Sequence, residues 1–154
     1  MKWTDILKPE AIKINFVNKS RDEVLRELLE YGKEQGVHQY NVDDVLQVLL
    51  QREKLISTGI GHGIALPHAK CDFCNDFISL MGIIPDGIDY NSADGKPVTI
   101  ICAVIGPKEQ PNKNIKLLAR IARILDQEQV RESVKNMKNP DEVFHFLKKI
   151  EDNI

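Results

Sequence analysis

A glycine-rich segment followed by a histidine holds the residues of this chain that are best suited to chemistry. The segment is STGIGHGIALPHAK, residues 57–70, and it places His68 directly after Pro67. Proline fixes its own φ and offers no amide donor, so the backbone that leads to the histidine is stiff. A neutral imidazole is nucleophilic at one ring nitrogen. The segment therefore allows a metal ligand, a phosphate-binding loop, a nucleophile or simply a tight turn.

The glycines alone do not predict a nucleotide site. No Gly-Lys-Ser or Gly-Lys-Thr follows Gly59, Gly61 and Gly63, as a Walker P-loop requires, and GIGHGIA lacks the spacing of a dinucleotide fingerprint. Glycine permits positive φ and the close approach of another chain. On the glycines alone we expect a bulged strand or turn with no chemistry of its own.

Groups that could bind an anion stand close to His68 in the sequence. Arg52 precedes the glycines, and Ser57 and Thr58 begin the segment. Phosphoryl transfer depends on cationic and hydrogen-bonding groups around the transferred oxygens, and a planar guanidinium group is well suited to them. For Arg52, a solvated charge at a helix end is the alternative. With the imidazole, these groups suit a phosphohistidine.

A short strand and two amphipathic helices are expected before the glycine segment. IKINF, residues 12–16, alternates apolar and polar residues as a strand does. Ser20 with Glu23 makes a capping box ahead of VLRELLEYGKEQG, and Asn41 with Asp44 marks the start of VLQVLLQREKL. Leucines and valines recur at helical spacing in both segments and predict a buried face.

Strands and then further helices are expected after it. FISLMGII at 77–84 and VTIICAVI at 98–105 are apolar runs separated by two Asp-Gly turn signals. We expect two buried strands joined by an irregular turn. The sequence after Asn112 has helical periodicity, and Asn139-Pro140 marks the start of the last helix. This order predicts an α/β sheet with helices on its faces.

Composition narrows the class of protein. The 154 residues are 42% hydrophobic and 29% charged, and we expect one domain over 1–154. A formal net charge of −2 gives no reason to expect a nucleic-acid partner. No apolar run approaches the ~20 residues of a membrane helix, and the N-terminus lacks a secretory pattern. Three cysteines, an odd number, argue against a disulfide framework and for a reducing compartment, so we expect a cytoplasmic protein without membrane insertion.

The stretch REKLISTGIGHGIALPHAK, residues 52–70, resembles the active-site signature of a known family. These are the type-2 enzyme IIA domains of the bacterial phosphoenolpyruvate-dependent phosphotransferase system, with fructose, mannitol and nitrogen-regulatory members. The resemblance extends over NKSRDEVLRELLE, DGKPVTIICAVIGP and the helix near Asn114. It implies a mixed β-sheet between helices, a phosphorylated nucleophile at His68, an active-site arginine at Arg52, and no cofactor or metal.

The resemblance also implies partners. His68 would accept a phosphoryl group from the histidine phosphocarrier protein and pass it to a IIB component. The alternative is a nitrogen-regulatory role, in which the phosphorylation state controls binding to regulatory target proteins. A docking rim must be partly apolar, and we expect Ile60, Ile64 and Leu66 to contribute to it or to the core.

Two identities depart from the family pattern. The chain has Asn114 where the family usually carries a second histidine, and His62 where asparagine is common. We hypothesise that both side chains lie close to His68, so that the pocket keeps one imidazole and one amide as phosphate-binding groups beside Ser57 and Thr58. The alternatives are an exposed loop residue at position 62, a helix cap at position 114, or a domain silenced by the loss of the second histidine.

Cys71 and Cys74 are a further departure, in the run His68-x-x-Cys71-x-x-Cys74. The spacing is compatible with a compact metal site or with redox switching. The segment leads into a predicted strand, where alternation would send the two thiols to opposite faces. No second cysteine or histidine pair has a matching spacing. We therefore expect neither a metal site nor thiol control of His68.

Overall fold

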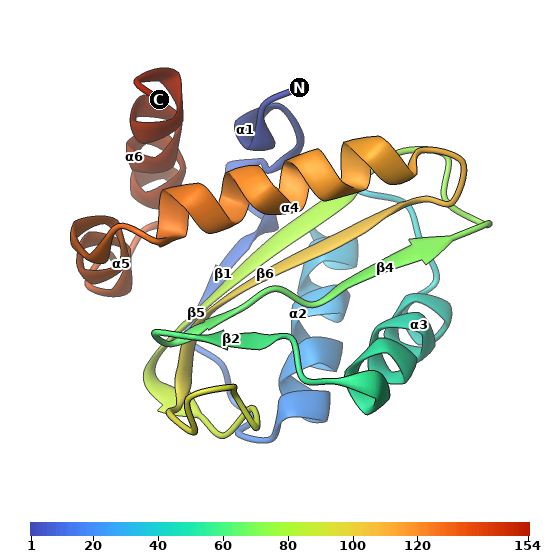
Figure 1. The fold of residues 1–154 in the computed structure, drawn as a ribbon, viewed down its shortest axis with the longest axis horizontal. Helices are drawn as coiled ribbons and strands as arrows, with labels where there is room; N and C mark the ends of the chain where they lie inside the picture. The colour runs from blue at the N-terminus through green and yellow to red at the C-terminus, as the bar shows by residue number, and fades with distance from the viewer.

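A mixed β-sheet lies between two layers of helices (Figure 1). The computed structural model describes all of residues 1–154. Five strands follow the order β1-β5-β6-β3-β2, and β4 also pairs with β6. The strands are β1 Ile12–Ile14, β2 Gly59–Gly61, β3 Ile64–Ala65, β4 His68–Cys71, β5 Ile78–Ile88 and β6 Val98–Pro107. The predicted α/β sheet flanked by helices is confirmed.

The pairing of strands explains the shape of the glycine segment. β2 and β3 form an antiparallel pair, whereas β3 and β4 both run parallel to β6. Ile64 lies opposite Ile100 and His68 opposite Val104, so β3 and β4 continue along β6 in one register. The segment is thus a strand, a tight turn and a strand, as the glycines alone predicted.

Helices cover both faces of the sheet. They are α1 Trp3–Ile6, α2 Arg21–Glu34, α3 Val42–Leu55, α4 Pro111–Leu125, α5 Glu128–Lys135 and α6 Pro140–Asp152, with a 3₁₀ turn at Pro9–Ala11. α2 and α3 pack on one face, and α1, α4 and α6 lie on the other (Figure 1). Gly82 of β5 faces Leu28 of α2, whereas Gly106 of β6 faces Asn114 of α4. None of the helices combines the length and the apolar character needed to cross a bilayer.

The predicted helix starts are confirmed at three places. Ser20, Asn41 and Asn139 each accept hydrogen bonds from amides in the first turns of α2, α3 and α6. These bonds satisfy donors that the helix leaves unpaired. The first Asp-Gly pair behaves differently, because β5 continues past it to Ile88 with a shift in register and a positive φ of 74° at Gly87.

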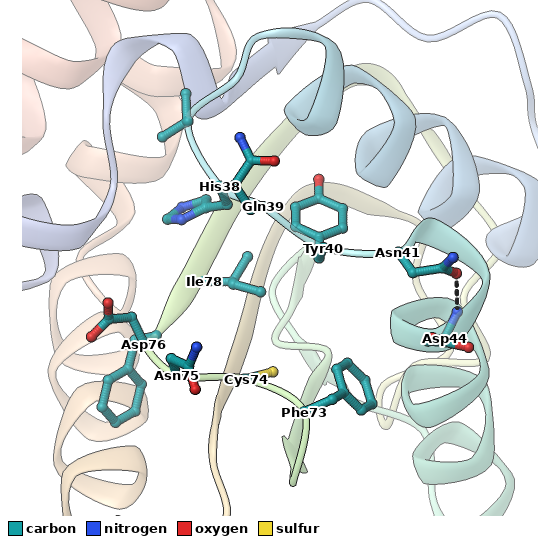
Figure 2. A pocket seen from close by; sticks show the side chains of 12 residues that line it. His38, Gln39, Tyr40, Asn41, Asp44, Phe73, Cys74, Asn75, Asp76 and Ile78 are labelled. Atoms are coloured by element: carbon teal, nitrogen blue, oxygen red, sulfur yellow. Dashed lines mark hydrogen bonds between the residues drawn. The ribbon is translucent and has the colours of Figure 1, made fainter.

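Cys71 and Cys74 form a disulfide, with their Cα atoms 5.8 Å apart. This corrects the expectation that the two thiols point to opposite faces of a strand. β4 ends at Cys71, so strand alternation does not extend to Cys74, which lies in the loop before β5. Figure 2 shows Phe73, Cys74 and Asn75 on that loop, across a pocket from Tyr40.

A buried carboxylate joins the two ends of the chain. Glu151 of α6 accepts hydrogen bonds from the amides of Trp3 and Thr4 at 2.7 and 2.9 Å, and from the Thr4 hydroxyl at 2.7 Å. Arg120 donates to the same carboxylate through Nε at 2.5 Å. Burial raises the pKa of Glu151, but these hydrogen bonds lower it further, so the pKa lies below its ordinary value of 4.5.

Replacing Glu151 with glutamine should lower the free energy of unfolding by about 2–3 kcal/mol at pH 7, because each carboxylate oxygen accepts two bonds and the amide nitrogen that replaces one oxygen cannot accept any. Because the pKa of Glu151 is lower in the folded state than in the unfolded state, the carboxylate contributes its full stabilisation of the fold above the unfolded-state pKa. That contribution is lost as the pH falls through the folded-state pKa. The difference in stability measured by urea titration should therefore begin to shrink below about pH 4.5 and disappear only below the folded-state pKa of Glu151. Glu109→Gln, at an exposed carboxylate, is the control. A difference that stays constant with pH would contradict the assignment.

Candidate functional site

His68 projects from the face of the sheet that α4 covers. It lies opposite Val104 of β6, and Gly106, two residues further along that strand, faces Asn114. Alternate residues of a strand share a face, so His68 and Asn114 lie on the same side of the sheet. The histidine is partly exposed. Its position on β4 leaves it open to another molecule.

One hydrogen bond sets the orientation and the tautomer of the neutral ring. Nδ1 of His68 lies 2.7 Å from the carbonyl oxygen of Leu66. A carbonyl oxygen can only accept, so Nδ1 carries the proton and donates it. Nε2 is then the nitrogen with the free electron pair. The fold therefore presents Nε2 as the nucleophilic atom of this imidazole.

Arg52 is anchored on the segment that leads from α3 into β2. Its Nη1 donates to the carbonyl oxygen of Ile56 at 3.0 Å. The amide of Leu66 donates to the carbonyl of Thr58 at 2.9 Å, which extends the antiparallel pairing of β2 with β3. Ile56 is the C-cap of α3 and stands two residues before Thr58. The guanidinium group has five N–H donors, so one bond to Ile56 leaves others for an anion.

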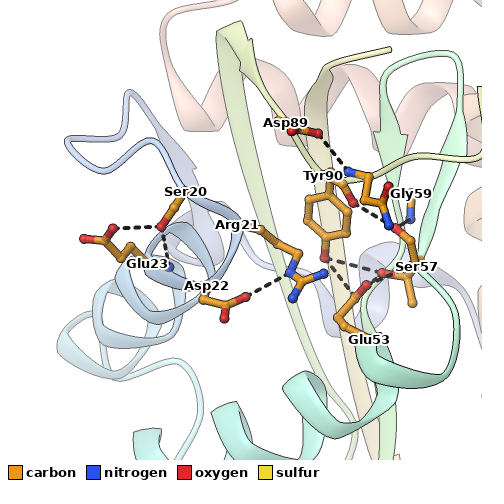
Figure 3. Close-up of polar contacts among 11 residues, drawn as sticks. Ser20, Arg21, Asp22, Glu23, Glu53, Ser57, Gly59, Asp89 and Tyr90 are labelled. Atoms are coloured by element: carbon orange, nitrogen blue, oxygen red, sulfur yellow. Dashed lines mark hydrogen bonds and ion pairs between the residues drawn. The ribbon is translucent and has the colours of Figure 1, made fainter. Parts of the chain in front are cut away.

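The hydroxyl groups of Ser57 and Thr58 are used inside the protein (Figure 3). Ser57 donates to the carbonyl oxygen of Tyr90 at 2.9 Å, and Thr58 donates to the carboxylate of Glu53. Each hydroxyl has one proton, so neither is free to donate to a phosphoryl oxygen. This corrects the expectation that the two residues support phosphate through their hydroxyl groups.

Glu53 is a residue of this region that the sequence reasoning missed. It is buried on α3 and accepts hydrogen bonds from the amide of Thr58 at 2.9 Å and the hydroxyl of Tyr90 at 3.0 Å. Burial and the nearby carboxylate raise the pKa of Tyr90, which keeps its hydroxyl protonated as a donor. Glu53 lies on the same face of α3 as the buried Leu46 and Leu49. Its helical spacing from these leucines could have predicted from the sequence that it is buried. Its bonds hold the chain that leads from Arg52 to the glycines.

Asn114 closes the turn between β6 and α4. The side chain is buried, and its Nδ2 lies 3.3 Å from the carbonyl oxygen of Gln110 and 3.5 Å from that of Pro107. Its oxygen packs against Gly106. The residue is in the first turn of α4, whose N-cap is Gln110, so Asn114 is not the cap. Along the strand direction it lies about two residue spacings, ~7 Å, beyond His68.

The structure does not bring His62 to His68. His62 occupies the turn between β2 and β3, where its amide donates to Asp94 at 3.0 Å and its φ is 58°. Ile64 precedes His68 by four residues in the continuous register, which is ~13 Å of strand, and His62 lies beyond Ile64. The turn and β4 lie toward opposite ends of the sheet edge (Figure 1). The expected exchange of an imidazole and an amide within one pocket is therefore corrected.

The exposed apolar side chains differ from those expected. Ile64 and Leu66 are buried in the core, and Ile60, although exposed, belongs to the end of the sheet that carries His62. Two other exposed apolar residues belong to the segments that carry Arg52 and Asn114. Ile56 is 68% exposed where it accepts from Arg52, and Ile115 is 62% exposed beside Asn114. Both fall on the outward sides of their segments, which is why helical periodicity did not single them out.

Exposed lysines lie on β4 and around the start of α4. Lys70 is exposed two residues further along β4 on the same face, and Lys108 and Lys113 are exposed at the turn before α4 and in its first turn. The first turn of a helix also presents unpaired amides and the positive end of the helix dipole. The corner is therefore suited to an anionic group. No three metal-binding side chains gather anywhere in the structure.

The sequence and the fold of this chain match known proteins. The family described as phosphoenolpyruvate-dependent sugar phosphotransferase system, EIIA 2, matches residues 5–150. The nitrogen regulatory protein of Bradyrhizobium diazoefficiens is 32% identical over 147 residues, which cover 96% of this chain and 95% of the relative. The crystal structure of nitrogen regulatory protein IIA-Ntr from Neisseria meningitidis superposes with a TM-score of 0.85 at 26% identity, covering 94% of this chain and 97% of that one.

A second solved structure has the same fold. It is the complex of IIA mannitol with phosphorylated IIB mannitol from Escherichia coli, with a TM-score of 0.77 at 22% identity, covering 93% of this chain and 97% of that one. The family match extends over nearly all of the present chain. This chain is a member of the type-2 EIIA family of the phosphoenolpyruvate-dependent sugar phosphotransferase system.

Proposed function

We propose that this EIIA protein carries a phosphoryl group on Nε2 of His68, taking it from the histidine phosphocarrier protein and passing it to a IIB component. The observation that carries the proposal is the hydrogen bond from Nδ1 to Leu66, which leaves Nε2 unprotonated on a partly exposed ring. Members of the EIIA family are phosphoryl carriers with a transferase role. To this family role we add Nε2 of His68 as the acceptor atom and the residues that bind the transferred group.

Each transfer exchanges one nitrogen–phosphorus bond for another bond to phosphorus. The electron pair of Nε2 attacks the phosphorus of the donor phosphohistidine, and the bond that breaks returns its electron pair to the donor ring. Nδ1 of His68 keeps its proton, so the phosphorylated ring is cationic and faces the Leu66 carbonyl. In the second step the IIB nucleophile attacks the same phosphorus, and Nε2 recovers its electron pair.

Arg52 is proposed as the group that neutralises the transferred oxygens. It is partly exposed and tied to Ile56, and it keeps donors for two phosphoryl oxygens in a fixed fork. Lys70 lies on the same face as His68 and adds a second cation. We assign Asn114 a positioning role through its contacts with the turn before α4.

A regulatory role is the second candidate, and the names of two relatives favour it. The matched proteins from Bradyrhizobium and Neisseria are nitrogen regulatory proteins and cover almost the whole chain. In that role phosphorylation of His68 would change which target protein binds, because the dianionic phosphoryl group and the cationic ring together make an exposed corner more negative by about one charge. The same phosphorylation chemistry serves both roles.

Incubation with phosphoenolpyruvate, enzyme I and the histidine phosphocarrier protein tests the proposal. Intact mass should rise by one phosphoryl group, and the modification should be acid-labile and base-stable. Addition of a IIB protein then separates the two roles. Loss of the label to IIB supports transport, whereas a target protein that binds without removing phosphate supports regulation. No gain in mass would contradict both.

Replacing Asn114 with histidine should destabilise the protein by about 1–3 kcal/mol, because a larger ring must fit the buried site against Gly106. The rate of phosphorylation should stay within about tenfold of wild type, a change of at most ~1.4 kcal/mol in the barrier, since Asn114 donates to backbone carbonyls. Urea unfolding and a phosphorylation time course measure the two effects, with the exposed Asn112→His as control. A wild-type protein that accepts no phosphate, and an Asn114→His variant that does, would show a silenced domain instead.

A further inference from the structure

Cys71 and Cys74 close a four-residue loop at the end of the strand that carries His68. β4 runs from His68 to Cys71, a distance of three residue spacings or about 10 Å. Cys71 pairs with Pro107 of β6, and its carbonyl oxygen accepts a hydrogen bond from the amide of Lys108 at 3.0 Å. The disulfide therefore attaches the following loop to the turn that leads into α4.

The size of this loop argues against a purely structural disulfide. A disulfide stabilises a fold mainly by restricting the unfolded chain, and the effect grows with the number of residues enclosed. Cys71-x-x-Cys74 encloses very few, and the same spacing is typical of thiol–disulfide exchange sites. Cys74 is partly exposed whereas Cys71 is buried, so Cys74 is the more accessible of the two to an external thiolate.

Cys102 provides an internal contrast. It is a free thiol, completely buried in β6, and burial raises its pKa above the ordinary value of 9.0. A thiol without access to solvent and with little thiolate does not exchange. The chain therefore holds one inert cysteine and one pair arranged for exchange.

The loop closed by the disulfide forms one wall of a pocket of about 480 Å³. Figure 2 shows Phe73 and Cys74 on this wall, facing the segment with Tyr40 and Asn41 that joins α2 to α3. Phe73 lies between the two cysteines and is 47% exposed. Opening the disulfide would release the covalent constraint on this aromatic side chain without breaking any strand pairing of His68.

An interface centred on His68 reaches the end of β4, where this loop begins. A typical protein interface buries about 800 Å² on each partner, which corresponds to a patch of ~16 Å radius. The end of β4 lies about 10 Å from His68 and is therefore within that footprint. Aromatic side chains are enriched in protein interfaces. A loop that already holds such a side chain in place loses less conformational entropy when a partner binds.

We propose that Cys71 and Cys74 are a reversible redox site, and that the disulfide strengthens docking of a phosphoryl-transfer partner by holding the loop that carries Phe73. The effect on docking rests on the function proposed above. The co-reactant is a dithiol–disulfide protein or a low-molecular-weight thiol–disulfide couple.

The exchange balances as a two-electron reaction. A thiolate of the reductant attacks Sγ of Cys74, the Cys71–Cys74 bond breaks, and Cys71 leaves as a thiolate that takes up a proton. A second thiolate of the reductant then attacks the mixed disulfide and releases Cys74. The protein gains two electrons and two protons, and the reductant becomes a disulfide. Oxidation reverses each step.

The test uses the whole protein in buffers with graded ratios of reduced to oxidised glutathione, followed by denaturation, alkylation and intact mass. Wild type should change from three alkylated thiols to one as the buffer becomes oxidising, and Cys102→Ser from two to none. The double variant Cys71→Ala with Cys74→Ser should keep one throughout. Phosphorylation rates at several concentrations of phosphorylated carrier are then compared for the two forms.

We expect reduction to raise the KM for the carrier by roughly 3–10-fold with kcat unchanged, because the groups around Nε2 do not depend on the disulfide. Cys102→Ser should respond as wild type, and the double variant should show no response to the buffer. Three thiols in every buffer, or one thiol in every buffer, would overturn the redox site. Equal KM values in both forms would overturn the effect on docking. Absence of phosphorylation in both forms would overturn the proposed function together with that effect, while the thiol count would still decide the redox site.

Discussion

Replacing His68 with alanine should abolish covalent phosphorylation by the phosphoenolpyruvate, enzyme I and histidine phosphocarrier system. The variant lacks the only nitrogen that the proposed reaction uses, so no slower route through the same site remains. The ring makes one hydrogen bond, to Leu66, so its loss should leave the fold intact. Intact mass should show no phosphoryl adduct after times at which wild type is fully modified, with circular dichroism and thermal unfolding as checks on folding.

His62 supplies the matched control for this experiment. It belongs to the same glycine segment, but it lies more than four residue spacings away along the sheet. His62→Ala should therefore accept phosphate at a rate within a few-fold of wild type. Phosphorylation of His68→Ala, or its loss in His62→Ala with His68 intact, would show that another histidine is the acceptor.

Replacing Arg52 with alanine should lower the rate of phosphoryl transfer by about 10²–10³-fold at saturating carrier. Groups that stabilise charge developing in a transition state typically contribute that much when they are removed. Arg52→Lys should recover only part of the loss, because an ammonium group keeps the charge and lacks the planar fork. Rapid-quench measurements of phosphohistidine formation give the rates.

Lys54→Ala is the control for general loss of positive charge, because Lys54 is exposed in the same last turn of α3 and has no ion-pair partner. Its rate should stay close to wild type. A rate for Arg52→Ala within threefold of wild type would contradict the role given to the guanidinium group. A change in KM alone would assign Arg52 to docking of the carrier.

Local signals in the sequence were sufficient for most of the fold. The polar residues at the starts of α2, α3 and α6 cap those helices because each can reach an unpaired amide one turn ahead. The run at 98–105 is a central strand buried on both faces, which is why it is almost wholly apolar. These features depend on neighbours within a few residues, and a single sequence contains that information.

The site was less predictable because it depends on register and on side-chain partners. His62 and His68 are close in sequence, but the turn and the straight strand after it separate them along the sheet. The hydroxyl of Thr58 is unavailable because Glu53 accepts its proton. Alternation misplaced Cys74 because β4 ends at Cys71, three residues before it. None of these contacts follows from spacing alone.

Nitrogen-15 NMR of the phosphorylated protein, labelled in its histidine rings, tests the central claim most directly. The account predicts that the phosphoryl group is bonded to Nε2 of His68 and that Nδ1 remains protonated, because the Leu66 carbonyl accepts from Nδ1. The nitrogen–phosphorus coupling and the ring shifts distinguish the two nitrogens. A phosphoryl group on Nδ1, or on any residue other than His68, would contradict it.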